Sequence, residues 1–373
     1  MAQLLSRRRT LSLFGTAIAS CAVTSAASAA FTRVGEGALG EAAALAGILF
    51  GGAIDTSAFE DQAYGELYSR EARILTTENA FKIAVLRRGP EVADLDFSRA
   101  DQILAFAQEL DMPLRASTLI WNDDIPRWVS SLPTREIERL FDAHIDAVAS
   151  RYAGRIFAYD VVNEPLYPWR GASAEGYRRG VWFDALGPSY IARAFRRVAA
   201  IDRKAKLVLN EAFTERDDAI GAFMRARLLR LIDDLLDQGT PLHAVGLQGH
   251  IQPQYGFAAE AYGELLHEIG RRGLDVHITE LDVDDTSLPA GIAARDNSVA
   301  GFYARFVSTA MSERAVKTVV TWGLSDRYSW YRLTAIARKA PPGWSARPLL
   351  FDDRLAPKPA YQAMKAAFEG RGI

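Results

Sequence analysis

Short apolar runs alternate with amphipathic stretches along most of this chain. The helix-like stretches, with apolar residues at helical spacing, are Ala100–Leu110, Glu136–Ser150, Tyr190–Ile201, Ala222–Leu236 and Ala261–Arg271. The strand-like runs are Ile48–Ile54, Ile74–Thr76, Leu114–Trp121, Ile156–Val162, Leu207–Asn210, Ala244–Gln248, Val276–Thr279 and Thr318–Gly323. Strands that alternate with helices indicate βαβ units and a parallel sheet. Eight such units predict an α/β fold, a single (β/α)8 TIM barrel. A doubly wound sheet is the alternative, but no Gly-x-Gly-x-x-Gly motif follows a strand.

The first 46 residues differ from this pattern. Arginines precede Leu11, an apolar stretch follows to Val23, and small residues occupy 26–30. This order predicts an export signal over 1–30, and the paired arginines fit the twin-arginine type. An uncleaved anchor is the alternative, although the apolar stretch is short for a membrane span. Residues 31–46 are small and Gly/Ala-rich and predict a linker, which leaves 47–371 for the barrel. We therefore expect a periplasmic or extracellular protein.

Composition narrows the classes of function. Of the 373 residues, 49% are hydrophobic and 24% are charged, which is ordinary for a globular protein. The net charge of −2 and the absence of a basic run beyond the N-terminus argue against a nucleic-acid partner. The single cysteine, Cys21, lies inside the expected signal, so the mature chain would contain no disulfide. Residues 18–21 also fit a lipoprotein cleavage box, in which case Cys21 would carry a lipid anchor.

Polar and aromatic residues stand at the ends of nearly all the predicted strands. They are Glu78, Asn79 and Lys82 after the second, Trp121 and Asn122 at the third, Asn163 and Glu164 at the fourth, Asn210 and Glu211 at the fifth, Gln248 and His250 at the sixth, Glu280 and Asp282 at the seventh, and Trp322 and Trp330 at the eighth. A barrel brings all of these positions to one face. A single strand-end glutamate is more often a solvated acid, and His250 alone would more often be a core histidine. Their joint occurrence favours a site, and two carboxylates are the minimum for breaking a glycosidic bond.

Four segments carry a resemblance to a known family. With Asp160–Pro165, Gln248–His250, Thr279–Asp282 and Trp322–Trp330 in this order, the chain resembles glycoside hydrolase family 10, the β-1,4-xylanases, from about Ala46 to Phe368. The resemblance implies a (β/α)8 barrel, secretion, no metal or organic cofactor, and endo-hydrolysis of xylan with retention at the anomeric carbon. Its expected partner is xylan or a xylo-oligosaccharide, with no nucleic acid and no stable membrane insertion after processing. We expect a monomer.

The resemblance also assigns roles to individual residues. It makes Glu164 the general acid/base and Glu280 the nucleophile. Asn163 would bind the 2-hydroxyl of the −1 sugar, and His250 would bind the nucleophile, with Asp282 orienting the imidazole. The remaining substrate-binding residues are Asn79 and Lys82 at subsite −2 with Glu78 beside them, Gln248 near the acid/base, Ser117 at the −1 sugar, and Trp121, Trp322 and Trp330 around subsites −1 and −2.

The chain departs from the family pattern at two strand ends. The family usually has Arg-Gly-His-Thr-Leu-Val-Trp-His after the third strand, whereas residues 115–122 place Ser117 and Asn122 at the two histidine positions. The usual Asn-Asp-Tyr-Asn is replaced over 210–213, where Ala212 and Phe213 follow Glu211. We expect a working enzyme with altered contacts to the −1 and leaving-group sugars. A related β-glycanase, a xylo-oligosaccharide hydrolase and a non-catalytic carbohydrate-binding barrel are the alternatives.

Overall fold

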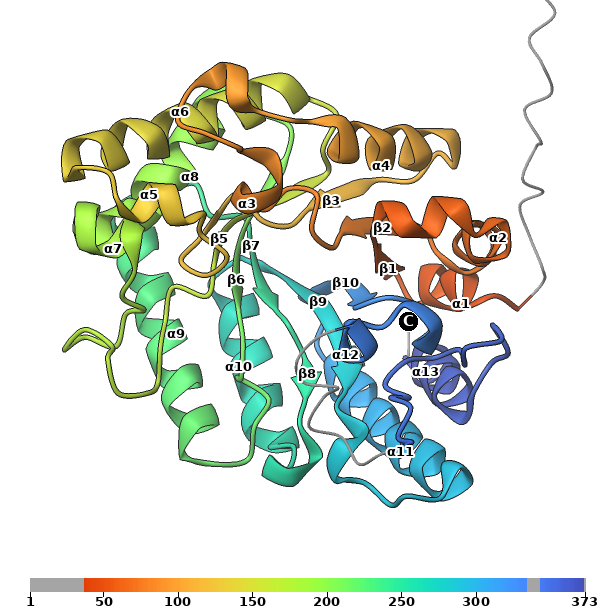
Figure 1. Ribbon diagram of the computed structural model, residues 1–373. Helices are drawn as coiled ribbons and strands as arrows, with labels where there is room; N and C mark the ends of the chain where they lie inside the picture. The colour runs from red at the N-terminus through yellow and green to blue at the C-terminus, as the bar shows by residue number, and fades with distance from the viewer. Residues whose placement is uncertain (1–36, 334–342, 372–373) are drawn as a thin grey trace, which may run out of the picture. The chain divides into compact units, whose positions relative to one another are not determined.

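The computed structural model describes residues 37–333 and 343–371, and its core is a closed parallel barrel (Figure 1). The eight barrel strands are β1 (Leu49–Ile54), β2 (Ile74–Thr77), β3 (Leu114–Ala116), β5 (Ala158–Asn163), β6 (Lys206–Glu211), β7 (Ala244–Leu247), β9 (Asp275–Val283) and β10 (Val316–Thr321). The barrel closes because β10 pairs with both β9 and β1. The predicted (β/α)8 barrel is confirmed. The expected signal over 1–30, with Cys21, lies outside the described residues.

Helices surround this barrel (Figure 1). The longer helices are α2 (Gln62–Glu71), α4 (Ser98–Glu109), α6 (Thr134–Tyr152), α8 (Tyr190–Ile201), α9 (Ala219–Asp237), α10 (Ala259–Arg271), α11 (Ile292–Met311) and α13 (Pro359–Glu369). The shorter ones are α1 (Leu39–Leu45), α3 (Ile83–Leu86), α5 (Arg127–Ser130), α7 (Val181–Leu186) and α12 (Trp330–Leu333). In α8, Tyr190, Ala194 and Val198 are buried while Arg193 and Arg197 form ion pairs, which is the amphipathic pattern of a covering helix. No helix in the described ranges is long and apolar enough to cross a membrane.

The third predicted strand is interrupted, which corrects its predicted extent of Leu114–Trp121. Strand β3 ends at Ala116, and pairing resumes only in β4 (Ile120–Trp121), which lies against the end of β5. In the gap the backbone N–H of Ser117 donates to Thr77 Oγ1, and the N–H of Leu119 donates to the carbonyl of Asp160. These bonds replace the missing strand pairing, and β4 thereby places Trp121 next to the end of β5. A similar two-residue strand, β8 (His250–Ile251), extends the rim beside β9.

The predicted linker over 31–46 is wrong for residues 39–45. Helix α1 (Leu39–Leu45) occupies that segment, and Leu39 and Ala43 are fully buried. The backbone N–H of Leu39 donates to the buried carboxylate of Glu71 at the end of α2 (3.0 Å). Small alanines and glycines were interpreted as loose sequence, but small side chains also allow a helix to pack closely. The helix therefore belongs to the folded barrel.

Candidate active site

The two predicted catalytic glutamates are joined by a chain of three amide side chains. Glu164 follows β5 and Glu280 lies in β9. Gln248 Nε2 donates to Glu164 Oε1 (2.8 Å) and to Asn163 Oδ1 (3.4 Å). Asn210 Nδ2 donates to Asn163 Oδ1 (2.8 Å) and to Glu280 Oε1 (2.7 Å). Amides whose donors are shared in this way hold both carboxylates in fixed positions, as a reaction with two carboxylates requires.

Glu164 occupies a strained position in which its side chain is 13% exposed. Its φ of 49° lies in the left-handed region that residues with a side chain rarely adopt. Its carboxylate accepts hydrogen bonds from Trp121 Nε1 (3.2 Å) and Arg178 Nη2 (2.8 Å) as well as from Gln248. Burial raises the pKa of Glu164, and Arg178 acts against that rise, while the charge of Glu280 adds to it. A carboxyl group whose pKa is raised can keep a proton for donation, which fits a general acid.

Glu280 is held differently, by an imidazole that is itself bound by an acid. His250 Nε2 lies 3.2 Å from Glu280 Oε2, and His250 Nδ1 lies 2.8 Å from Asp282 Oδ1. Burial lowers the pKa of His250, but Asp282 and Glu280 outweigh it and raise the pKa well above its ordinary value. A protonated His250 donates to both carboxylates, so the Glu280 carboxylate is oriented by two N–H donors. This arrangement suits a nucleophile and contrasts with that of Glu164.

A second polar cluster lies beyond Trp121, where the resemblance places subsite −2. We call its four side chains, Asp55, Glu78, Asn79 and Lys82, the Lys82 cluster. Asn79 Nδ2 donates to Asp55 Oδ2 (2.8 Å), and Lys82 Nζ donates to Asn79 Oδ1 (2.8 Å). Lys82 Nζ also lies 5.4 Å from the centre of the Trp121 ring. Burial, followed by the charge of Asp55, raises the pKa of Glu78 to about 7. The structure therefore connects Glu78, Asn79 and Lys82 to Glu164 through one tryptophan.

Trp322 and Trp330 both lie against His250. The ring centres of His250 and Trp322 are 6.1 Å apart, and those of His250 and Trp330 are 5.4 Å apart. Trp330 Nε1 donates to Asp282 Oδ2 (2.8 Å), so the tryptophan also fixes the acid that orients the imidazole. Both rings are thus part of the support of Glu280. A sugar-binding role for their faces stays a prediction.

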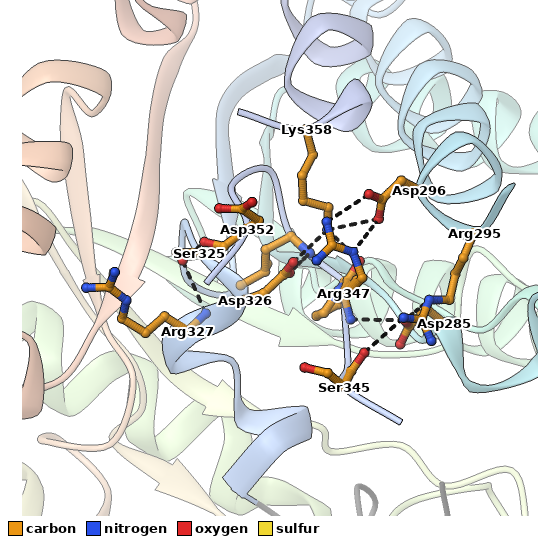
Figure 2. A network of polar contacts seen from close by, with 12 residues as sticks. Asp285, Arg295, Asp296, Ser325, Asp326, Arg327, Ser345, Arg347, Asp352 and Lys358 are labelled. Atoms are coloured by element: carbon orange, nitrogen blue, oxygen red, sulfur yellow. Dashed lines mark hydrogen bonds and ion pairs between the residues drawn. The ribbon is translucent and has the colours of Figure 1, made fainter. Parts of the chain in front are cut away.

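The loop that carries these tryptophans is fixed by a buried ion-pair network, which Figure 2 shows. Asp326 lies in the short helix between Trp322 and Trp330, and it accepts hydrogen bonds from Lys358 Nζ (2.9 Å) and the backbone N–H of Leu349 (2.9 Å). The pair Asp296–Arg347 connects α11 to the same C-terminal segment. The pair Asp285–Arg295 connects α11 to the short helix after β9, and Asp285 also accepts the backbone N–H of Arg347. We call these six side chains, Asp285, Arg295, Asp296, Asp326, Arg347 and Lys358, the C-terminal ion cluster.

The two residues that replace the family histidines have different surroundings. Ser117 is 3% exposed, and its side chain lies beside Asp160. Asp160 forms a fully buried ion pair with Arg115. Asn122 Oδ1 accepts from the backbone N–H of Trp182 (3.2 Å), and its Nδ2 donates to the Tyr190 hydroxyl (3.4 Å). Asn122 therefore binds α7 and α8, whereas Ser117 stays near the centre of the barrel.

Aromatic rings also lie in the loop that follows Glu164. Tyr167 and Trp169 follow β5, and Trp169 lies edge-on to Phe213 with their ring centres 5.0 Å apart. Trp169 is 38% exposed and, with Tyr167 and Phe223, lines a cavity of about 640 Å³. An aromatic face is therefore present beside this loop, although Ala212 stands where the family has a tyrosine.

The role of Arg178 is not apparent from the sequence, and Asn210 and Glu211 contribute more to the site than their strand-end positions alone indicate. Asn210 bridges Asn163 and Glu280, and Glu211 accepts the backbone N–H groups of Leu166 (3.1 Å) and Ala212 (2.9 Å). Both stand at a predicted strand end, so their position was a usable signal. Arg178 lies in a loop with several other charged residues, and no spacing distinguished it. No group of three or more metal-ligating side chains occurs in the described part of the chain.

A barrel with two hydrogen-bond-linked glutamates at the ends of its strands is the architecture of a retaining or inverting glycoside hydrolase. The model of glycosyl hydrolase family 10 matches residues 38–367. The chain belongs to this family.

Individual relatives support the same assignment. Endo-1,4-beta-xylanase B of Thermotoga neapolitana is 28% identical over 315 residues, which are 83% of this chain and 84% of that protein. A beta-1,4-xylanase of Dictyoglomus thermophilum is 30% identical over 306 residues, 80% and 82% of the two chains. Among solved structures, native xylanase 10B from Thermotoga maritima superposes with a TM-score of 0.79 at 29% identity and covers 89% of this chain and 98% of that one.

Proposed function

We propose that this protein is an exported endo-1,4-β-xylanase that cleaves internal bonds of xylan with retention of configuration. The observation that carries the proposal is the unequal treatment of two linked carboxylates. Glu164 has a raised pKa and accepts from Trp121, Arg178 and Gln248, whereas the more deeply buried Glu280 is held by Asn210 and His250. Retention requires this division between a proton donor and a nucleophile. The family membership and the xylanase relatives support the choice of xylan as substrate.

In the first step, a Glu280 oxygen attacks C1 of the −1 sugar and forms a glycosyl ester. Glu164 gives its proton to the departing glycosidic oxygen. In the second step, water adds to C1, the bond from C1 to Glu280 breaks, and the proton of water passes to Glu164. Asn163 Oδ1 already accepts from Asn210 and Gln248, and Asn163 Nδ2 has no partner among the described residues. That free donor is available for the 2-hydroxyl of the −1 sugar.

The substrate chain is proposed to run from the Lys82 cluster, past Trp121, to the aromatic side near Trp169. Lys82 and Asn79 offer hydrogen bonds for the −2 sugar, and Trp169 offers a partly exposed ring for a sugar on the leaving-group side. Aromatic faces bind sugar rings through apolar contact while hydroxyl groups stay hydrated. Ser117, buried beside Asp160, would contact the −1 sugar less directly than the family histidine.

The decisive experiment follows xylo-oligosaccharide hydrolysis by residues 31–373 with proton NMR. We expect the β-anomer of the product to appear first and the α-anomer only after mutarotation. The control, Glu280→Ala, is expected to release no product. Initial appearance of the α-anomer would exclude retention. Equal release by the variant would exclude Glu280 as nucleophile, and a clear preference for cello-oligosaccharides would replace xylan as the substrate.

Export is the remaining part of the proposal, and it rests on the arginines and the apolar stretch of 1–30. The signal should direct the protein to the periplasm or the medium, where the monomeric barrel meets its polymeric substrate. Replacing Arg8 and Arg9 together by lysine would keep the protein in the cytoplasm if the twin-arginine interpretation is correct. Unchanged export of that variant would contradict it. A lipidated Cys21 would appear as label from a radioactive fatty acid.

A further inference from the structure

Arg178 contacts both the side chain and the main chain of Glu164. It lies in the loop between β5 and α7, and its side chain is only 11% exposed. Nη2 donates to Glu164 Oε2 (2.8 Å), and Nε donates to the Glu164 carbonyl oxygen (2.9 Å). Nη1 donates to Asp123 Oδ2 (2.8 Å), and the guanidinium lies over the Tyr167 ring at 4.9 Å. One planar group thus fixes the backbone and the carboxylate of the same residue.

The backbone contact matters because Glu164 has a φ of 49°. Two bonds hold that conformation: the N–H of Glu164 donates to the carbonyl of Asn210 (2.9 Å), and its carbonyl accepts from Arg178. The backbone N–H of Arg178 also donates to the carbonyl of Pro165 (2.7 Å), the residue after Glu164. The loop is therefore folded back onto the end of the catalytic strand, and the cation cannot move away without disturbing that turn.

We propose that Arg178 is a positioning residue that stabilises the ionised form of Glu164 through the second half of the reaction. The inference rests on the proposed function, in which Glu164 is an acid first and a base second. In the second half, water adds to C1, the ester bond from C1 to Glu280 breaks, and Glu164 accepts the proton. Only the ionised Glu164 can do this, and Arg178 is the charged donor on its carboxylate.

The groups around Glu164 make this cation necessary. Glu280 on β9 and Glu211 on β6 are buried acids, Gln248 and Trp121 are neutral donors, and Asp123 is bound to Arg178 itself. Burial and the charge of Glu280 both raise the pKa of Glu164. Without Arg178 that pKa would rise further, which helps proton donation but impairs proton acceptance. Arg178 therefore lowers the pKa of Glu164 enough for the carboxylate to accept a proton, while burial keeps that pKa high enough for the acid to donate one.

A titration of the protein tests the proposal without any need for turnover. Glutamate labelled with ¹³C at the side-chain carboxyl is followed by NMR against pH, and Glu164→Gln identifies the signal. In Arg178→Met the Glu164 midpoint should move up by at least one pH unit. Arg178→Lys keeps the positive charge but loses the pair of guanidinium donors, so the Glu164 midpoint should move less. Unmoved midpoints in both variants would overturn the proposal. If Arg178→Met does not fold, the Glu164 midpoint in Arg178→Lys is the test, and an unmoved midpoint there would overturn the proposal.

The adjacent Arg179 provides the matched control. Its side chain is 60% exposed and binds Asp184, which is 50% exposed, on the surface. Arg179→Met removes the same charge one residue away and should leave the Glu164 midpoint unchanged. An equal shift in Arg179→Met would show a general effect of net charge and would overturn the role of Arg178.

Kinetics with an activated substrate separates the two halves of the reaction. Dinitrophenyl β-xylobioside has a leaving group that needs no proton, so its kcat reports the second half. We expect Arg178→Met to lower kcat at least tenfold at pH 6, and we expect kcat of the variant to recover as the pH rises. A loss of equal size at every pH would indicate a structural role only. A wild-type protein that hydrolyses no xyloside would contradict the proposed function. The titration would still test whether Arg178 stabilises the ionised form of Glu164.

Discussion

The active site and the C-terminal ion cluster both bury charge at the carboxyl end of the barrel, but they balance it differently. In the ion cluster, three acids face three bases: Asp326 pairs with Lys358 (2.9 Å), Asp296 with Arg347 (2.7 Å) and Asp285 with Arg295 (3.2 Å). In the active site, among the residues that the structure describes, Glu164, Glu280 and Asp282 form ion pairs with one arginine, Arg178, and one histidine, His250. Paired charges stabilise one arrangement, whereas an excess of acids raises the pKa of one of them.

This difference assigns the two regions separate tasks. Burial, with a smaller contribution from the charge of Glu280, raises the pKa of Glu164, so the proposed proton donor lies where charge is incompletely balanced. The balanced pairs in the ion cluster hold the loop of Trp322 and Trp330, which in turn fixes Asp282 through Trp330 Nε1. Changes in the first region should therefore abolish activity at little cost in stability. Changes in the second should lower stability first.

The largest expected effect is that of Glu280→Gln. This change keeps the shape of the side chain and removes the nucleophile, so kcat/KM on xylan should fall at least about a thousandfold, or ~4 kcal/mol. The free energy of unfolding should stay the same or rise by about 1 kcal/mol, because a buried acid is removed from an acid-rich site. Urea denaturation and initial rates on the same preparation measure both. A strongly destabilised variant would contradict the assigned division of tasks.

Lys358→Met should have the opposite profile. Lys358 is 4% exposed and contacts Asp326 and the carbonyl of Arg347. Its removal leaves the Asp326 carboxylate buried without its cation, which costs about 3–5 kcal/mol of unfolding free energy. The kcat/KM of the folded variant at low temperature should stay within about threefold of wild type.

The control for that change is Lys365→Met. Lys365 is 26% exposed at its side chain and lies 3.9 Å from Glu369 one helical turn away in α13. Partly exposed pairs of this kind contribute little, so the variant should lose less than about 0.5 kcal/mol. Equal losses of unfolding free energy in Lys358→Met and Lys365→Met would show that the C-terminal ion cluster stabilises the protein no more than a partly exposed ion pair does.

Glu211 should make stability depend on pH. Burial, followed by the charge of Glu164, raises the pKa of Glu211 to about 8, above the ordinary 4.5 of a glutamate. The folded state then binds more protons than the unfolded state between pH 4.5 and 8, so stability falls as pH rises through this window. Glu211→Gln removes the titration, and the loss between these pH values should shrink by about 4 kcal/mol. Urea denaturation at pH 4.5, 6 and 8 measures the slope, and an unchanged slope would count against the burial of a protonated Glu211.

The smallest expected effect is that of Asn122→Ala. Asn122 accepts from the backbone of Trp182 and donates to Tyr190, so its loss should cost about 1 kcal/mol of stability. Because it carries no charge into the acid-rich site, kcat/KM should change less than about twofold. A large loss of activity at nearly unchanged stability would instead place Asn122 at the substrate, where the family has a histidine.

The sequence by itself determined the barrel and which strand ends carry polar side chains. Apolar runs at strand length, separated by amphipathic stretches, specify parallel strands because both faces of such strands are buried. The order of strands then brings Glu164, Glu280, Gln248 and His250 to one rim, since strand ends in a parallel barrel share an edge. Periodicity and position along the chain were therefore sufficient for these four residues.

Only the tertiary structure decided which side chains meet across the fold. The break between β3 and β4, the packing of α1 and the pairing of Lys358 with Asp326 depend on contacts between segments far apart in the sequence. Arg178 is the clearest case, because nothing in its loop distinguishes it from Arg179. One arginine reaches the carboxylate of Glu164 and the other remains on the surface. A charge acquires its role from burial and from its neighbours, and neither is a property of local sequence.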